Sequence, residues 1–427
     1  MKKILHLCDL KKEEIYVLIK KRFKKNLFRD LNKHLNDREI SKYIGVKIGT
    51  FKYWKKEGEN YTYKYNKKFV KSYIPIKYLF SLIELAKTKN YRDYNKMLEK
   101  NVVAYKRIGG KPIFKPKFPI KFETEEGAIV AAAILHDGGI AINEVPTYAN
   151  NESCMRRRVV FAIKKLVGDI KIDFNKDTHL NFPKIIKDIL VVGLNMKIGK
   201  KVYTNPKIPD IFLKTNKRKI ISTFLNQSFS DDGSAYISRS NRKGVCLGIS
   251  IDVSHLDEAK RKKIKVERLT EYAPNLIKDC KNLLERLRIK VNGPYFRQEY
   301  IGYDKSKKRF VHAWGIEILG KENIRRFKDL IGFSIPRKNQ KLEEILNSYK
   351  YATYGKSIEE ALENIRVIKR RKMQINSKNF VKLKNCSFRR ARDLLKILRD
   401  KGKINVMSGG HIKGVHGYEM YNYEIVK

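Results

Sequence analysis

The sequence has few cysteines, no long apolar run and few acidic residues. Its five cysteines are odd in number and never form a Cys-x-x-Cys pair, which indicates neither a disulfide framework nor a zinc ribbon. The longest apolar run, Ala128–Leu135, is far shorter than the roughly 20 residues that cross a bilayer. The first apolar stretch, Ile4–Cys8, is too short for a signal peptide. We therefore expect a cytoplasmic, nucleoid-associated protein with reduced thiols and no membrane partner.

Basic residues greatly outnumber acidic ones. The 427 residues include 95 Lys and Arg against 45 Asp and Glu, which gives a formal net charge of +50. This excess is spread along the whole chain and predicts a polyanionic partner, of which nucleic acid is the first candidate. The hydrophobic fraction of 42% excludes wholesale disorder, and the length predicts two to four domains. Because charge alone gives affinity without sequence preference, a ribosome-associated or chromatin protein stays open at this point.

The first recognisable unit, Arg38–Trp54, has the pattern of a helix-turn-helix. Ile40 and Ile44 lie four residues apart and would share one buried helix face. Gly45 would supply the left-handed turn position, and Phe51 would anchor the second helix. The second helix would present four residues to the major groove of DNA: Lys47, Thr50, Lys52 and Tyr53. The alternative is an ordinary pair of core helices.

Two similar segments lie between residues 120 and 350. In each, a helical apolar stretch ends in Asp-Gly and is followed by a strand-like run. The first segment has its Asp-Gly at Asp137, and the second has it at Asp232. Two further matches follow in the same order, residues 155–165 with 242–255 and Pro183 with Pro274. Three matches in one order predict a tandem repeat.

Period-two alternation predicts strands within both segments. In the second segment the predicted buried residues are Val245, Leu247, Ile249, Ile251 and Val253. In the first they are Val159, Phe161 and Ile163, with Arg158, Ala162 and Lys164 on the open face. A basic sheet face in so basic a chain favours contact with phosphates and base edges, although a solvated face is the alternative. The expected DNA contacts on the sheets are Arg156, Arg158, Lys164 and Ser250.

These segments resemble the LAGLIDADG homing endonucleases in their single-chain, two-motif form. Val130–Gly138 and Leu225–Gly233 would be the two motifs, and the resemblance covers residues 120–350. It implies an α+β fold in which tandem αββαββα repeats form a DNA-binding saddle. The second motif departs from the family pattern, because Asn226 and Gln227 stand where small residues are usual.

The resemblance also implies a reaction. The last acidic residue of each motif, Asp137 or Asp232, would bind Mg²⁺ or Mn²⁺, which prefer oxygen ligands, and metal-assisted phosphodiester hydrolysis would follow. Family members often carry a catalytic lysine on the strand before the last helix of a repeat. The nearest candidates are Lys214 in the first copy and Lys321 in the second, where the alignment itself places Glu317.

The C-terminal part resembles a winged helix. A charged helical stretch, Ser357–Lys372, precedes an amphipathic helix with the apolar stripe Ala391, Leu394, Leu395 and Leu398. A Gly-rich stretch, Ser408–Gly417, would join two β-prone runs as a hairpin wing. Three arginines outside the stripe are expected to contact DNA: Arg389, Arg390 and Arg392. A small interaction domain is the alternative.

Four domains follow from these assignments. A Pro- and Gly-rich stretch, Arg107–Phe122, predicts a linker or extended arm, because proline removes amide donors. The predicted domains are an N-terminal helix-turn-helix domain with this linker, two repeats and a winged-helix-like domain, covering residues 1–115, 116–214, 215–350 and 351–427.

One function leads among those that these features allow. The chain would be a site-specific endonuclease of the intron-homing type, a metal-dependent hydrolase that cuts double-stranded DNA as a monomer with pseudo-two-fold symmetry. A catalytically inactive DNA-binding protein or transcriptional regulator on the same scaffold is the alternative. An RNA-binding maturase is a third candidate, because charge does not separate RNA from DNA.

Overall fold

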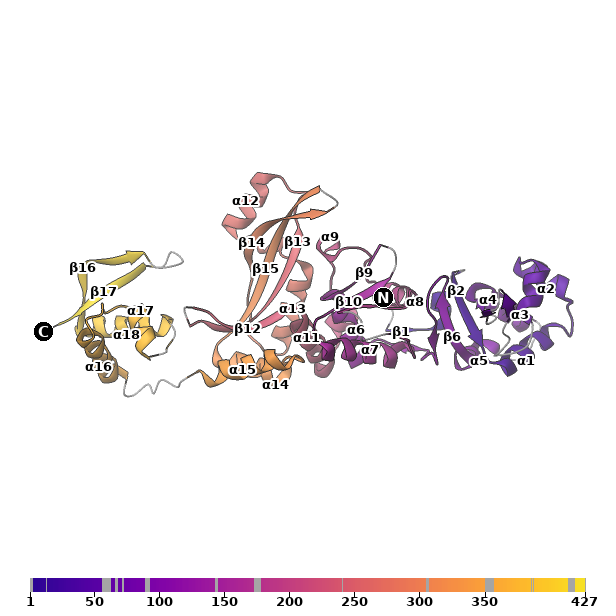
Figure 1. Cartoon of the computed structure of the whole chain (residues 1–427), viewed down its shortest axis with the longest axis horizontal. Helices are drawn as coiled ribbons and strands as arrows, with labels where there is room; N and C mark the ends of the chain where they lie inside the picture. The colour runs from indigo at the N-terminus through magenta and orange to yellow at the C-terminus, as the bar shows by residue number, and fades with distance from the viewer. Residues whose placement is uncertain are drawn as a thin grey trace. The chain divides into compact units, whose positions relative to one another are not determined.

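The computed structural model shows an α+β protein, as predicted (Figure 1). It describes residues 3–12, 14–55, 63–65, 68–70, 73–88, 93–142, 145–172, 178–239, 241–304, 307–349, 357–384, 386, 388–413 and 419–426. The chain divides into two compact units. Unit 1 contains Met1–Gly233, Leu247–Ile316 and Leu330–Ile335, and unit 2 contains Ser234–Cys246, Glu317–Asp329 and Pro336–Lys427. No helix in the described ranges is long and apolar enough to cross a membrane.

The N-terminal part of unit 1 combines helices with a four-stranded antiparallel sheet of order β5-β2-β6-β7. Its helices are η1 (Leu7–Leu10), α1 (Lys21–Leu31), α2 (Asp37–Ile44), α3 (Ile48–Lys55), α4 (Ile76–Thr88) and α5 (Tyr94–Asn101). Its strands are β1 (Ile4–Leu5), β2 (Ile15–Ile19), β3 (Tyr63–Tyr65), β4 (Lys68–Val70), β5 (Ile74–Pro75), β6 (Val102–Arg107), β7 (Ile113–Phe114) and β8 (Ile120–Lys121). Two further antiparallel pairs are β1 with β8 and β3 with β4.

Helices α2 and α3 lie at the predicted place, on either side of a turn at Gly45. The Asn36 side chain accepts two backbone N–H groups of the first turn, and Glu39 accepts the Asn36 N–H at 2.7 Å, so α2 begins at a capping box. Gly45 ends α2 with φ 71° and ψ 36°, which confirms the predicted left-handed turn position. Phe51 is fully buried, and its ring lies 5.5 Å from the ring of Phe28, which holds α3 on α1.

The stretch predicted as a linker, Arg107–Phe122, is tied into unit 1 by hydrogen bonds. Phe114 and Asp169 exchange two backbone hydrogen bonds of 2.9 and 2.7 Å. Arg107 donates to both carboxylate oxygens of Asp188, at 3.0 and 3.1 Å, and the Asp188 side chain is fully buried. The predicted domain boundary at residue 115 therefore falls inside a unit.

The central part contains two runs of elements in the same order, helix, strand, strand and helix. The first run contains α6 (Glu125–Leu135), β9 (Gly138–Ile140), β10 (Pro146–Ala149) and α7 (Ser153–Val167). The elements that follow it are β11 (His179–Asn181), α8 (Ile185–Leu194), α9 (Lys201–Thr204) and α10 (Asp210–Lys214). The second run contains α11 (Arg218–Asp232), β12 (Gly233–Ile237), β13 (Lys243–Asp252) and α12 (Glu258–Glu267). The elements that follow it are η2 (Thr270–Tyr272), α13 (Asn275–Arg286), β14 (Asn292–Asp304), β15 (Lys307–Leu319), α14 (Lys321–Leu330) and α15 (Pro336–Asn347). The sheet orders are β11-β10-β9 and β12-β13-β15-β14.

Residues 155–165 form part of helix α7, not the predicted strand. Phe161 was expected to be buried, but it is 59% exposed, while Ala162 is buried. The buried residues of α7 recur at helical spacing: Met155, Val159, Val160, Ala162, Ile163, Leu166 and Val167. The match of this segment with β13 is therefore wrong. The match of Pro183 with Pro274 is wrong as well, because α8 follows strand β11 whereas α13 precedes strand β14.

Strand β13 is confirmed, but its alternation is weaker than predicted. Val245, Leu247 and Val253 are buried, whereas Ile249 and Ile251 are half-buried. Cys246 was expected on the open face and is buried. The first half of the strand is covered on both faces, so only its second half leaves one face partly accessible.

The C-terminal segment has helices followed by an antiparallel hairpin, in the predicted order. The elements are α16 (Ser357–Arg370), α17 (Ser377–Lys384), α18 (Phe388–Asp400), β16 (Ile404–Lys413) and β17 (Glu419–Ile425). The predicted stripe on α18 is confirmed, since Ala391, Leu395 and Leu398 are fully buried in the core of this segment. The last residues of the predicted Gly-rich wing, from 414 onward, lie outside the described residues.

Candidate active site

Helices α6 and α11 pack against each other in unit 1. Helix α6 ends at Leu135, two residues before Asp137, and α11 ends at Asp232, so an Asp-Gly pair closes each helical segment. Ala131–Ala133 on α6 are fully buried, and their small side chains leave room for a neighbouring helix. Each glycine after the aspartate lies against backbone. An added Cβ would lie 2.6 Å from a carbonyl oxygen at Gly138 and 2.7 Å from one at Gly233. The Asp-Gly pairs are therefore fixed by close backbone approach, and they deliver Asp137 and Asp232 to the same end of the helix pair.

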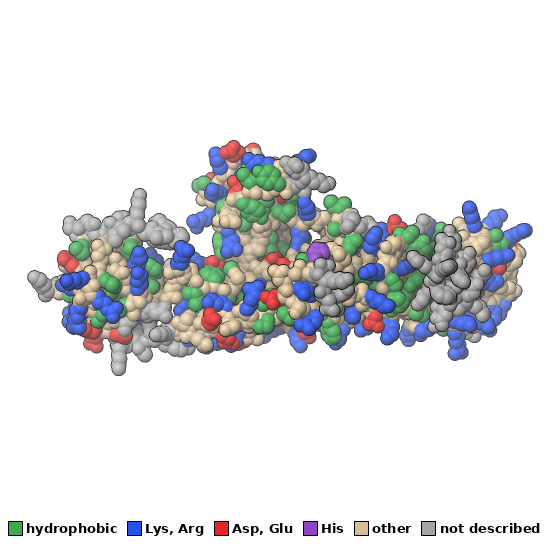
Figure 2. Space-filling view, viewed as in Figure 1, with side chains coloured by type: hydrophobic (Ala, Val, Ile, Leu, Met, Phe, Trp, Pro, Cys, Tyr) green, Lys and Arg blue, Asp and Glu red, His purple; other side chains and the backbone are tan. Residues whose placement is uncertain are grey.

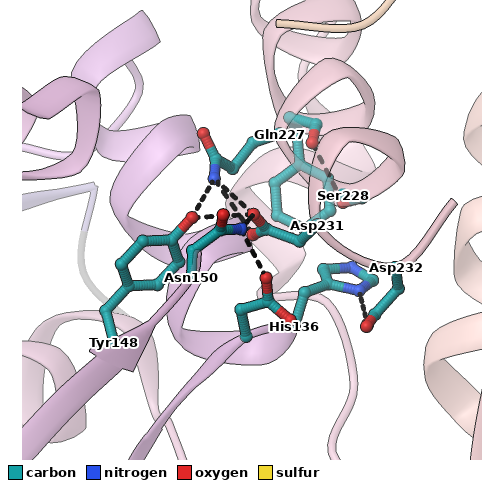
Figure 3. Close-up of polar contacts among 9 residues, drawn as sticks. His136, Tyr148, Asn150, Gln227, Ser228, Asp231 and Asp232 are labelled. Carbon is teal, nitrogen blue, oxygen red and sulfur yellow. Dashed lines mark hydrogen bonds and ion pairs between the residues drawn. The ribbon is translucent and has the colours of Figure 1, made fainter. Parts of the chain in front are cut away.

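Asp231 lies at the centre of a hydrogen-bond network that joins the two halves (Figure 3). Tyr148 on β10 donates its hydroxyl to Asp231 Oδ1 at 2.8 Å. Gln227, one helical turn before Asp231, donates to its two carboxylate oxygens at 3.1 and 3.0 Å. Asn150 donates to Asp231 Oδ1 at 3.3 Å. Tyr148 and Gln227 are fully buried, so the network is held rigidly.

The two motif aspartates have their own partners. Asn150 donates to Asp137 Oδ2 at 2.7 Å and therefore links Asp137 to Asp231. His136 Nδ1 lies 2.7 Å from Asp232 Oδ2, so the histidine of the first motif contacts the aspartate of the second (Figure 3). The His136 ring is buried, whereas the Asp232 side chain is 30% exposed. The Asp232 side chain is thus partly accessible to solvent while one of its oxygens is held in place.

The cluster concentrates negative charge around one lysine. Burial and the nearby charge of Asp232 raise the pKa of Asp137, and burial and the charge of Asp137 raise the pKa of Asp231 well above its ordinary value. Burial lowers the pKa of Lys201 on α9, while the attraction of Asp232, Asp137 and Asp231 opposes that effect. The site therefore places three carboxylates and one ammonium group within electrostatic reach of each other.

Two buried polar atoms at the site have no hydrogen-bond partner among the described residues. They are His136 Nε2 and Gln227 Oε1. A buried polar atom without a partner costs about 1 to 3 kcal/mol, so a water molecule or a bound ligand that hydrogen-bonds to these atoms would stabilise the site.

The donor set fits Mg²⁺ in one particular way. The described part of the chain contains no group of three or more His, Cys, Asp or Glu side chains that would enclose a metal ion. Mg²⁺ is commonly held by one or two carboxylates together with phosphate oxygens and water, rather than by an all-protein cage. Asp137 and Asp232 would supply such a pair, with the substrate phosphate completing the ligands.

The two predicted catalytic lysines lie elsewhere. Lys214 is on α10 with a 79% exposed side chain, and its ammonium group pairs with Asp210 at 3.0 Å. Lys321 begins α14 in unit 2 and donates to the carbonyl oxygen of Tyr349 at 3.5 Å. Glu317 accepts hydrogen bonds from Tyr236, at 2.8 Å, and from Arg242. The lysine that joins the aspartates in unit 1 is Lys201.

The prediction of a basic sheet face in the first repeat is wrong, because Arg156, Arg158 and Lys164 lie on helix α7. Arg158 is held inside unit 1, where its guanidinium donates to Asn226 and Ser334. Arg156 donates to the carbonyl oxygens of Asn150 and Asn151, at 2.5 and 2.9 Å, and so supports the Asn150 turn. Lys164 is half-buried. Ser250 is half-buried on β13, as a residue on a partly open sheet face would be.

The residues predicted to contact DNA in the terminal parts lie mainly on the surface. Lys47 lies just before α3 and is exposed, as are Thr50 and Lys52 on α3, whereas Tyr53 on α3 is half-buried. On α18, Arg389 and Arg392 are exposed and Arg390 is half-buried. Both helices therefore present a basic face opposite the face that is packed in the core.

Sequence reasoning missed Asp231, Lys201, Tyr148 and Asn150. Asp231 had a usable signal, because Gln227 precedes it by four residues on a helix. The other three come from β10, the turn after it and α9, and only the folded chain brings them to the motif helices. A scan against protein-family models finds no match for the chain, and a search of the curated proteins finds none either.

Proposed function

We propose that this chain is a metal-dependent, site-specific endonuclease for double-stranded DNA, built on two LAGLIDADG-like repeats with a helix-turn-helix before them and a winged helix after them. One observation carries the proposal. Asp137 and Asp232 follow equivalent, mutually packed helices, and both reach one cluster that also contains Lys201. The formal net charge of +50 over the whole chain supports a nucleic-acid substrate.

Each side chain of the cluster has a distinct role in this proposal. A divalent cation held by Asp137 and Asp232 would polarise the phosphate and lower the pKa of the attacking water. Asn150 fixes the orientation of Asp137, and His136 fixes that of Asp232. Lys201 would stabilise the negative charge that develops on the phosphate, because a pre-placed cation needs no reorganisation during the reaction.

A DNA-binding protein without cleavage activity is the second candidate. It is favoured by the hydrogen bonds that already occupy oxygens of Asp137 and Asp232. A role on structured RNA remains the third candidate, because the basic surface serves either polymer.

The deciding experiment uses the full chain and a randomised duplex DNA library at moderate salt, with Mg²⁺ or with EDTA. Both the retained and the cut molecules are sequenced. Breaks that need Mg²⁺ and share one sequence are the expected result. Sequence-specific retention without breaks would replace the endonuclease with the regulator, and absence of any sequence preference would direct the search to structured RNA.

Replacing Lys201 by methionine is expected to slow cleavage about 100-fold with little change in DNA affinity, because the lost charge acts mainly in the transition state. Lys214→Met is the matched control, since Lys214 is an exposed lysine on the neighbouring short helix α10. Single-turnover cleavage rates and binding in EDTA separate the two effects. Equal rates for both variants would remove Lys201 from the reaction.

A further inference from the structure

A cavity of about 530 Å³ lies in the N-terminal part of unit 1, between one face of α1 and the last residue of α3. Six of its eight lining residues are Lys or Arg, and the described lining contains no Asp or Glu. The lining residues are Lys21, Lys24, Lys25, Phe28, Arg29, Asn32, Lys33 and Lys55. Lys and Arg side chains also gather on the visible surface of the N-terminal elements, at the right of Figure 2.

The cavity is built on rigid elements. Lys21, Lys25, Phe28 and Asn32 recur every three or four residues and therefore share one face of α1. Phe28 is 3% exposed and is held by the ring of Phe51 on α3. Lys24 is only 5% exposed, so its apolar stem is packed in the structure. An apolar floor with a basic rim is thus fixed by the packing of α1 on α3.

Repulsion among the positive charges of the lining destabilises the folded protein, and an anionic ligand would offset this repulsion. Like charges three or four residues apart on a helix repel each other. Lys55 is paired with Asp37 at 2.8 Å, and Asp30 is paired with Lys33 at 3.2 Å and with Arg29 at 3.9 Å, so two carboxylates moderate this repulsion from beside the cavity. Six cationic side chains around one space still favour an anion, and clustered Lys and Arg donors suit phosphate oxygens.

The position of the cavity relates it to the helix-turn-helix. Helix α3 has eight residues and is therefore about 12 Å long, similar to the width of the DNA major groove. The exposed residues Thr50 and Lys52 lie on α3 and Lys47 lies just before it, and Lys55 at the end of α3 belongs to the cavity. In the proposed function α3 lies in the major groove, and Lys55 at its end would then lie toward the sugar–phosphate backbone that borders the groove.

We propose that this cavity binds phosphate and that the backbone of the DNA read by α3 supplies it. The choice of DNA as the source of the phosphate rests on the proposed function. The phosphate site itself is inferred from the cavity and its lining alone. A free polyphosphate or nucleotide is the other source of the same chemistry, and the experiment has an arm for each.

The test replaces the three exposed cationic residues of the rim in one variant, Lys21→Gln/Lys25→Gln/Arg29→Gln, in the full chain. The matched control, Lys87→Gln/Lys96→Gln/Lys100→Gln, removes the same charge from exposed positions on α4 and α5 of the same part of unit 1. Two ligands are titrated: the duplex selected from the library, over a range of salt concentrations, and inorganic tripolyphosphate at low salt.

The cavity variant is expected to bind the duplex about tenfold more weakly than the control variant. Its plot of log affinity against log salt should be less steep by about 2.7, because three phosphate contacts are lost and each lowers the slope by about 0.9. Its preferred DNA sequence should be unchanged, since backbone contacts do not read bases.

The remaining outcomes separate the phosphate site from the proposed function. Weaker tripolyphosphate binding by the cavity variant, with duplex binding like that of the control, would establish the site and overturn DNA as its source. Cavity-dependent tripolyphosphate binding by a protein that binds no nucleic acid would overturn the endonuclease and leave the site standing. Equal behaviour of the two variants with both ligands would overturn the phosphate site, whether or not the protein cuts DNA.

Discussion

Replacing Asp137 and Asp232 together by asparagine is expected to slow Mg²⁺-dependent DNA cleavage at least about 1000-fold, because a metal ion supplies several kcal/mol of transition-state stabilisation. Asparagine keeps the size of the side chain but loses the charge that holds a hard cation. The fold should tolerate the change, because burial and the charge of Asp232 already raise the pKa of Asp137 and disfavour its ionised form. Single-turnover cleavage of the selected duplex measures the effect.

Asp210→Asn is the control for this experiment, because Asp210 is an exposed carboxylate on α10 with a lysine partner. It should cleave at the wild-type rate. The double variant should bind DNA in EDTA at least as tightly as the wild type, since two negative charges near the phosphates are removed. Mg²⁺ should raise the melting temperature of the wild type more than that of the double variant. Undiminished cleavage by the double variant would show that the metal assignment is wrong.

Replacing Arg107 by methionine is expected to lower the free energy of unfolding of unit 1 by about 3 kcal/mol, because it leaves a buried carboxylate without its main partner. Arg107 donates two hydrogen bonds to Asp188, whose side chain is fully buried. It also donates to Glu14 at 2.5 Å. Lys12 and Lys187 lie 3.5 and 3.6 Å from Asp188 and keep the loss near the lower end of the usual range. Denaturant unfolding followed by tryptophan fluorescence and circular dichroism measures the change.

Two further variants give this stability prediction its contrast. Arg107→Met/Asp188→Leu removes both charges and should recover most of the lost stability, because no buried charge is left without a partner. Lys115→Met breaks an exposed pair with Asp169, 3.7 Å apart, and should change stability by less than about 1 kcal/mol. If the single Arg107 variant were as stable as the Lys115 variant, the tie between β6 and α8 would contribute little to the fold.

Sequence patterns identified the features that depend on neighbouring residues. The left-handed Gly45 follows from a turn between two short apolar patterns, and the ends of α6 and α11 follow from Asp-Gly after a helical stretch. The stripe on α18 follows from helical spacing alone. In each case the physical cause lies within about one or two helical turns, so the sequence carries it directly.

The errors have two different causes. The stretch Val159–Ile163 is apolar at every second residue, which predicts a strand, but Met155, Val159 and Ile163 are also spaced as in a helix. Short apolar runs rich in β-branched residues fit either period, and tertiary packing decides between them. Lys201 was missed for another reason. Its contact with the aspartates depends on how α9 returns to the helix pair, which no local pattern encodes.

The contacts around the motif helices run crosswise between the two halves. His136 of the first half contacts Asp232 of the second, and Asp231 of the second half contacts Tyr148 and Asn150 of the first. Counted back from the glycine, His136 and Asp231 occupy the same position. A symmetric dimer of two α11 halves would therefore bring four carboxylates together with no histidine between them. Self-association of the second half is therefore electrostatically disfavoured relative to its pairing with the first half, which supplies the histidine.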